Sequence, residues 1–287
     1  MSKTAKGASF LLAYTFFMAF MAMFSKLAGP VPTAEKVCIR SFFMLLFVSV
    51  TAVARHEIVV APRQSIVPLL CRAIGGTVSL TCNFYAVDHM NLADATLFNK
   101  MSPLFVVLFS ALLLKEKPLR IQIGLVIAAF FSSFLVIKPT GNGVQAGAAA
   151  IAMLGGITGG FATACVRWSE RRGASNYAIL FMFSAASFFG LLPAAVANYV
   201  PLSRPQFICL VCCGLSAAFG HFCLNKAYSY AQASEISVLD YTQIFFSALL
   251  SIIIFSDAPD MLSVLGYLMI IGIGSANTII SRKLRRA

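Results

Sequence analysis

The sequence predicts an all-α integral membrane protein with ten transmembrane helices, built as two inverted five-helix repeats around a central cavity. Hydrophobic residues make up 59% of the 287 positions and charged residues only 11%, which is roughly half the charged share of a soluble domain. Apolar runs long enough to cross about 30 Å of hydrocarbon recur along the chain. The second half of the chain also repeats the residue pattern of the first.

Glycine and proline break the apolar sequence into separate runs. Breaks fall at Gly29-Pro30, Pro62-Arg63, Lys117-Pro118, Pro139-Thr140-Gly141 and between Pro201 and Pro205. The connections are too short to hold an extramembrane domain, so we expect the function to lie within the bilayer. The predicted spans are 7–28, 33–54, 66–88, 92–114, 119–138, 146–168, 174–199, 204–230, 233–256 and 260–281.

The basic residues predict the orientation, because cytoplasmic loops of membrane proteins are enriched in lysine and arginine. If the N-terminus is cytoplasmic, the outer side holds only Lys26, Lys36, Lys138 and Arg204. The inner side then holds Lys3, Lys6, Arg55, Arg63, Lys115, Lys117, Arg120, Arg167, Arg171, Arg172, Arg282, Lys283, Arg285 and Arg286. We therefore expect a multi-pass protein of the inner cell membrane with both termini in the cytoplasm.

The formal net charge of +12 does not indicate nucleic-acid binding, because the basic residues lie in short groups between apolar segments rather than in one patch. The cysteines lie mostly inside apolar segments. Cys209 and Cys212 form a CxxC pair, but hydrocarbon side chains surround it. A zinc site needs further ligands in a polar turn, so we interpret these cysteines as small buried residues.

An internal repeat appears when the halves are aligned so that Asn99 meets Asp240. Each half, residues 1–141 and 142–287, then contains five predicted spans. An odd number of spans makes the second half enter the membrane from the opposite side, and inverted repeats are a recurring basis of alternating access. The alignment also pairs Asp94 with Glu235, Phe105 with Phe246, Glu116 with Asp257 and Pro118 with Pro259.

Three stretches of the first half are distinctive: Ala86-Val87-Asp88-His89-Met90-Asn91-Leu92-Ala93-Asp94-Ala95, Ser102-Pro103-Leu104-Phe105 and Leu114-Lys115-Glu116-Lys117-Pro118. Together they resemble the drug/metabolite transporter superfamily, EamA type. The second half matches more loosely, because Ile244 stands at the position of Pro103 and no lysine follows Asp257. The resemblance implies ten helices around a central cavity and export or exchange of metabolites, amino acids or nucleotide-linked solutes.

Polar residues inside spans are costly in hydrocarbon and are therefore candidates for function. Spans four and nine present matching polar stripes, which either line opposite walls of a cavity or join helices by hydrogen bonds. The stripes are Asn99, Ser102 and Ser110 in span four, and Asp240, Gln243, Ser247 and Ser251 in span nine.

Lys100 and Asp240 are the deepest cation and anion of these two spans. At 1.5 Å per residue, Lys100 lies about 12 Å below the outer end of its helix. Three roles are open for the two residues: mutual neutralisation, contact with a charged substrate, or protonation of Asp240 during proton coupling.

Further candidates lie in spans eight, three and two. His221, Asn225 and Tyr228 share one helix face, and His221 is either a proton shuttle, because imidazole titrates near neutral pH, or a packing residue. Arg40 either binds an anionic group or extends toward the interface. The remaining candidates are Ser79 and Asn83 in span three, and Tyr14, Phe17, Phe84 and Tyr241 as apolar or aromatic lining.

The segment Gly155-Gly156-Ile157-Thr158-Gly159-Gly160 contains two overlapping GxxxG spacings, which are typical of closely packed membrane helices. No strand pattern precedes it and no Lys-Ser/Thr pair follows, so it does not resemble a nucleotide-binding loop.

These patterns favour a secondary transporter with alternating access that exports or exchanges a small metabolite, such as an amino acid or related polar solute, with protons as a candidate coupling ion. The alternatives are a nucleotide-type exchanger, a channel or receptor, and a membrane-embedded transferase. A transferase needs a nucleophile with its base or an acidic metal cluster, and the chain has only three histidines. We expect no enzymatic activity, cofactor or metal, and a monomer or homodimer in contact with its solute and lipid.

The substrate-binding residues predicted from the sequence are Asn83, Asn99, Lys100, His221, Asn225, Asp240, Tyr241 and Gln243.

Overall fold

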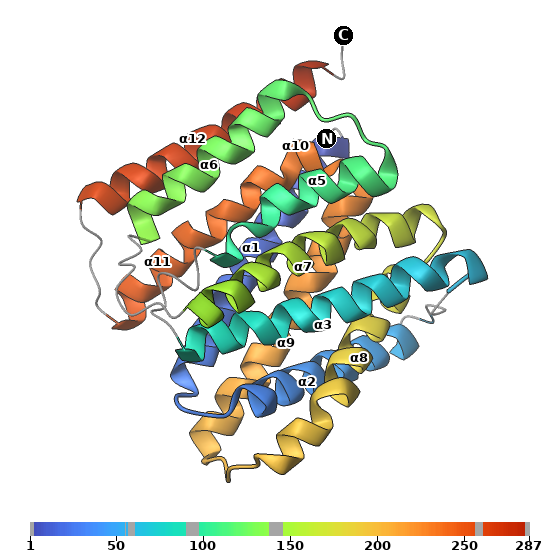
Figure 1. Cartoon of the computed structure of the whole chain (residues 1–287), viewed down its shortest axis with the longest axis vertical. Helices are drawn as coiled ribbons and strands as arrows, with labels where there is room; N and C mark the ends of the chain where they lie inside the picture. The colour runs from blue at the N-terminus through green and yellow to red at the C-terminus, as the bar shows by residue number, and fades with distance from the viewer. Residues whose placement is uncertain are drawn as a thin grey trace.

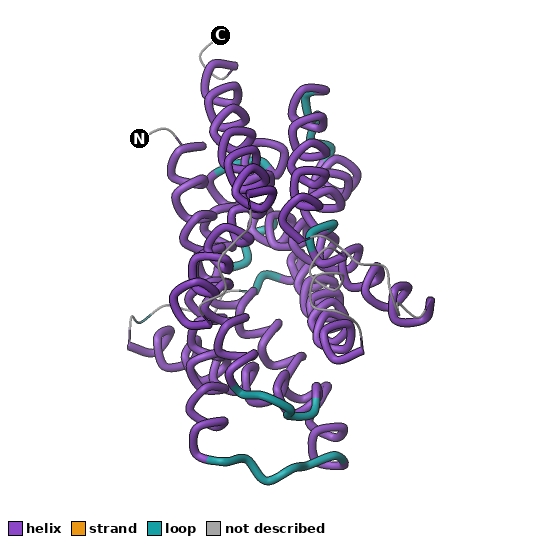
Figure 2. The backbone as a smooth tube through the Cα atoms, turned by 90° about the vertical axis from the view of Figure 1, so that its left-hand side faces the viewer, coloured by secondary structure: helices purple, strands orange, loops and turns teal. Residues whose placement is uncertain are grey.

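The structure is a computed structural model that describes residues 3–54, 56, 61–89, 98–137, 146–255 and 261–284. The described backbone is nearly all helical and contains no strand (Figures 1 and 2). In chain order the helices are α1 (Lys3–Leu27), α2 (Thr33–Ala54), the short 3-10 helix η1 (Arg63–Ser65), α3 (Ile66–His89), α5 (Ser102–Leu114), α6 (Arg120–Ile137), α7 (Ala146–Arg171), α8 (Asn176–Ala197), α9 (Arg204–Tyr230), α10 (Ala233–Ile236), the 3-10 helix η2 (Ser237–Tyr241), α11 (Thr242–Phe255) and α12 (Met261–Leu284).

Within the described part of the chain, six helices are long and apolar enough to cross a membrane: α1, α2, α3, α7, α8 and α9. Shorter apolar stretches lie in α5, α6 and α12. The helices α2 and α9 begin and end at the predicted residues, and Pro205 stands in the first turn of α9, where proline is compatible with a helix start. The motif residues Asp94 and Asp257 and the outer-side Lys138 lie outside the described residues.

The distribution of side chains is that of a protein dissolved in lipid. Large apolar residues cover the outer surface; Val53, Phe131 and Ile253 are each more than 60% exposed. Charged and polar side chains such as Arg40 and Lys100 are instead buried between the helices. A water-soluble protein does not expose apolar surface on this scale, so the exposed surface is suited to hydrocarbon.

The helices pack in matched couples (Figure 1). α1 packs on α9, and α7 packs on α3. In the repeat alignment of the sequence, α7 corresponds to α1 and α3 corresponds to α9. Likewise, α5 packs on α7 and its counterpart α11 packs on α1. The remaining counterparts pair with each other: α6 with α12 at one edge of the molecule, and α2 with α8 at the opposite edge.

Glycines in α7 allow this helix to approach its neighbours closely, as the GxxxG spacings predicted. A Cβ on Gly160 would stand 2.4 Å from the Cβ of Phe105 in α5, and one on Gly159 would stand 2.7 Å from the Oγ of Ser79 in α3. Real Cβ atoms do not reach such distances. The absence of a side chain therefore lets α7 fit between α3 and α5.

The prediction of one continuous helix over 233–256 is wrong. The segment is α10 followed by η2 and then α11, so the helix is tightened into a 3-10 turn at Ser237–Tyr241. The Oγ of Ser237 and the Oδ1 of Asp240 are both buried here without a hydrogen-bond partner among the described residues. In the first half, a turn at Lys100 and Met101 precedes α5 at the equivalent position, where Pro103 favours a helix start.

We predict that Gly160→Ala lowers the free energy of unfolding by about 1–3 kcal/mol, because the added methyl group overpacks the contact between α7 and α5. Thermal melting of the purified protein in one detergent measures the change. Gly190→Ala in α8 is the matched control, since its Cβ would meet nothing within 4 Å. Equal melting temperatures for the two variants would contradict the close packing at Gly160.

Candidate functional site

The helix interruption before α5 and the 3-10 helix η2 contact each other through Lys100. Its side chain is only 3% exposed, and its Nζ donates hydrogen bonds to the Oε1 of Gln243 at 2.7 Å and to the backbone carbonyl of Asp240 at 3.3 Å. That carbonyl lies in the 3-10 turn and also accepts from the backbone N–H of Thr242, and carbonyls at such helix breaks commonly bind cations in transporters. The structure thus brings together Lys100, Asp240 and Gln243, all of which the sequence predicted as site residues.

The described structure has no ion pair between the Asp240 carboxylate and Lys100. The ammonium group contacts the backbone oxygen of Asp240, while the carboxylate Oδ1 is buried and has no hydrogen-bond partner among the described residues. A buried, unpartnered carboxylate oxygen is costly in a low-dielectric interior. The Oδ1 of Asp240 is therefore an unused hydrogen-bond acceptor in the described structure.

A second polar group lies between α2 and α9. Arg40 is 1% exposed, and its Nη2 lies 3.1 Å from the Nε2 of His221. The Arg40 Nε donates to the Sδ of Met21 in α1 at 3.2 Å. Of the two roles considered for Arg40, extension toward the interface is wrong, because the guanidinium is enclosed by three helices.

Arg72 on α3 belongs to the same region, although sequence reasoning did not select it. Its guanidinium lies 4.1 Å from the ring centroid of Phe183, and Phe183 meets the His221 ring edge-on at 5.2 Å. The available signal was a lone cation inside the apolar run of span three, where charges are expensive.

Tyr14 on α1 connects the two polar groups. Its ring lies 6.1 Å from that of His221, and the hydroxyl of the next residue, Thr15, lies 3.0 Å from that of Thr242, two residues after Asp240. We call Tyr14, Arg40, Arg72, Lys100, His221 and Asp240 the polar centre.

The other predicted site residues have different surroundings. Asn225 is fully buried and donates to the Oδ1 of Asn176 at 2.7 Å, which joins α9 to α8. Asn83 donates to the Oγ of Ser79 at 3.4 Å beside α7. Tyr241 is fully buried in the largest apolar cluster, whereas Asn99 is exposed. Of the eight substrate-binding positions predicted from the sequence, the polar centre contains Lys100, His221 and Asp240, and Gln243 contacts it through Lys100.

An ion-pair cluster joins the ends of three helices. Glu116, just after α5, lies 2.5 Å from the Nε of Arg167 and 2.7 Å from the Nη2 of Arg171, both on α7. The Nη1 of Arg167 also donates to the carbonyls of Tyr228 and Ala231 at the end of α9. This cluster connects the first half of the chain to the second.

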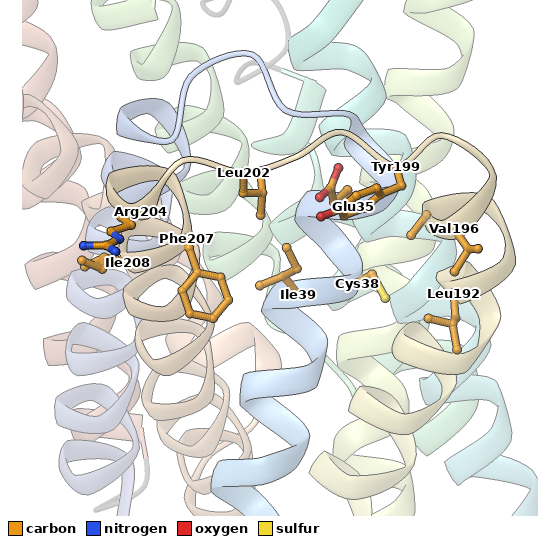
Figure 3. Close-up of a pocket in the computed structure, with 11 residues that line it drawn as sticks. Glu35, Cys38, Ile39, Leu192, Val196, Tyr199, Leu202, Arg204, Phe207 and Ile208 are labelled. Atoms are coloured by element: carbon orange, nitrogen blue, oxygen red, sulfur yellow. The ribbon is translucent and has the colours of Figure 1, made fainter.

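The pocket in Figure 3 has a volume of about 870 Å³ and lies apart from the polar centre. It lies where α2 begins, beside the connection from α8 to α9, and is lined mostly by apolar side chains such as Val196, Phe207 and Ile208. These three side chains are 47–68% exposed at the outer surface. The pocket is therefore a groove on the exposed side of the molecule and is lined by none of the polar-centre residues.

An apolar exterior, helices long enough to span a membrane and a buried polar centre define a multi-pass membrane transporter. Comparison with known proteins gives the family. The chain matches the EamA-like transporter family twice, over residues 5–138 and 146–276. It therefore belongs to that family, within the drug/metabolite transporter superfamily, and its substrates are small solutes.

Relatives agree with this assignment. The chain is 29% identical over 262 residues to the pseudopaline exporter CntI of Pseudomonas aeruginosa strain UCBPP-PA14, covering 91% of each protein. It is 23% identical to human solute carrier family 35 member G1, covering 91% of this chain and 76% of the relative. A crystal structure with 17% sequence identity matches 98% of the chain with a TM-score of 0.82, which shows a shared fold.

We predict that Glu116→Gln destabilises the protein by about 1–3 kcal/mol, because Arg167 loses its carboxylate partner in a mostly buried setting. Thermal melting in detergent measures the loss. Arg171→Gln is the matched comparison and should cost less than about 1 kcal/mol, since this side chain is 44% exposed. A larger effect for Arg171→Gln than for Glu116→Gln would contradict the assigned geometry.

Proposed function

We propose that this chain is a secondary transporter that exports or exchanges a small polar organic solute, such as an amino acid derivative, by alternating access. The observation that carries the proposal is a polar centre built by both halves of the chain: Tyr14, Arg40, Arg72 and Lys100 from the first half, His221 and Asp240 from the second, with both arginines, Lys100 and His221 buried. A site shared by two halves can be opened to either side when the halves move against each other.

The proposed architecture is ten spans in two inverted repeats, residues 1–141 and 142–287, in the inner cell membrane with both termini cytoplasmic. The matched couples of packed helices support it, because two similar halves related by a two-fold axis pack in equivalent pairs. The two separate family matches, one in each half, also support it.

Export is the favoured direction because the pseudopaline exporters resemble the chain over 91% of its length. In this proposal the cluster of Glu116, Arg167 and Arg171 closes the cytoplasmic side, since the positive-inside pattern places these residues there. Its ion pairs bridge the halves and have to separate when the site opens inward.

A counterflow experiment tests whether the protein is a carrier. Purified protein in liposomes preloaded with a candidate solute should accelerate uptake of the labelled solute, because a carrier returns loaded faster than empty. Candidate solutes come from comparing the metabolites of cells with and without the protein. Uptake that is unchanged by preloading would favour a channel and contradict alternating access.

We predict that Asp240→Asn abolishes pH-driven transport while the protein remains abundant and folded, because the amide cannot take up and release the coupling proton. Uptake into liposomes with and without an imposed pH gradient measures this. Gln243→Glu is the comparison variant: it keeps Asp240 and adds a second carboxylate one helical turn away, so pH-driven uptake should persist in it. Full gradient coupling in Asp240→Asn would exclude Asp240 as the proton carrier, and rescue by Lys100→Ala would assign the two residues to mutual neutralisation.

A further inference from the structure

We propose that Arg40, Arg72 and His221 form a subsite that binds a carboxylate group of the transported solute. This inference rests on the proposed transport function and adds the chemical class of the group that the polar centre recognises. It is drawn from the donors that the three side chains leave unused.

Arg40 is the first part of the subsite. Its guanidinium is buried, yet its described partners are a neutral imidazole and a thioether, and its Nη1 has no hydrogen-bond partner. The nearest acid along its own helix, Glu35, accepts a hydrogen bond from the backbone of Val200 instead. An arginine in hydrocarbon without an anionic partner is expensive.

Arg72 is positioned by stacking rather than by an acid. Its guanidinium lies on the Phe183 ring and folds back over Gly76, where an added Cβ would stand 2.1 Å from the Nη1 of Arg72. Stacking fixes the plane of the guanidinium without using its N–H groups. The Nε of Arg72 accordingly has no hydrogen-bond partner in the described part of the chain.

His221 connects the two arginines. Its Nε2 meets Arg40, its ring edge meets Phe183, and its Nδ1 is buried without a partner among the described residues. Phe183 carries the connection on to Arg72, whose guanidinium lies over the same ring that His221 meets. Unused donors therefore gather from α2, α3 and α9 in one buried region.

The arrangement suits a carboxylate for two reasons. Both arginines are buried, and a bound anion would offset the cost of holding two cations in a low-dielectric interior. The few unused donors match a planar, singly charged group with two oxygens, which guanidinium groups bind in a bidentate way. The described ion pairs involve Glu116 and not these arginines, so the solute is the proposed source of the anion.

Asp240 supplies the complementary charge. Helix α1 packs on both α9, which carries His221, and η2, which carries the Asp240 carboxylate. A solute with a carboxylate at one end and an ammonium at the other satisfies both groups. A phosphate dianion would instead be repelled by Asp240.

Ligand-dependent melting tests the subsite. The purified protein in detergent is melted in increasing sodium acetate, sodium glutarate or sodium L-glutamate, each against sodium chloride at equal ionic strength, with sodium phosphate as the competing oxyanion. We expect a saturable rise in melting temperature with at least one carboxylate, because a ligand that binds the folded state stabilises it. No rise with any carboxylate, or a rise with phosphate alone, would overturn the proposal.

Variants assign the effect to named residues. Arg40→Gln and Arg72→Gln should weaken the apparent carboxylate affinity by about tenfold to a hundredfold, the loss of one charge-assisted hydrogen bond. Arg40→Lys and Arg72→Lys keep the charge and should show a smaller loss if the glutamine variants do not fold. Arg63→Gln, at an exposed position in η1, is the control and should respond like the wild type. A wild-type response in all of the Arg40 and Arg72 variants would refute the subsite.

The same probes separate this inference from the transport function. Carboxylate stabilisation that depends on Arg40 and Arg72, without counterflow of that carboxylate, would retain the subsite and refute transport of that solute class. Counterflow of a solute at an unchanged rate and affinity in both lysine variants would retain the transporter and refute the subsite.

Discussion

The cost of placing charge in hydrocarbon governs this structure. Each buried cation needs a compensating group inside the bundle, because no water reaches the lipid-facing surface. Arg167 meets Glu116 and two backbone carbonyls, and Lys100 meets a carbonyl and an amide oxygen. Arg40 and Arg72 meet only neutral groups in the described structure. That difference separates the cations that hold the protein together from those available to a ligand.

The carbonyl oxygens exposed where helices end or tighten are hydrogen-bonded by lysine and arginine side chains. A helix that ends or tightens inside the membrane leaves carbonyl oxygens that water would otherwise satisfy. Here Lys100 donates to the carbonyl of Asp240 in η2, Arg167 to those at the end of α9, and Arg171 to that of Leu114 at the end of α5. The first of these contacts crosses between the halves near the polar centre. Moving the halves would therefore break the contacts of Lys100 and Arg171, whereas the contact of Arg167 with α9 lies within one half.

Close packing around α7 serves the same arrangement. Gly155 and Gly159 bring α7 against α3, and Gly160 brings it against α5. These contacts position α3, from which Arg72 projects toward Phe183 on α8. The glycine spacing was visible in the sequence because GxxxG acts through local helical periodicity. The pairing of Arg72 with Phe183 joins residues far apart in the chain, and no local pattern predicts it.

Composition, hydropathy and basic-residue placement determined the membrane class of this protein, because solvation in lipid acts on every residue by its type alone. The motifs around Ser102-Pro103 and Glu116 likewise indicated the family. Tertiary structure decided which polar residues meet: Lys100 lies on a backbone carbonyl rather than on the Asp240 carboxylate, Asn225 pairs with Asn176, and Arg40 turns inward to His221. Such choices depend on distances between helices from different parts of the chain. In a low-dielectric interior, a shift of one helical turn changes which charge is satisfied and which remains open to a solute.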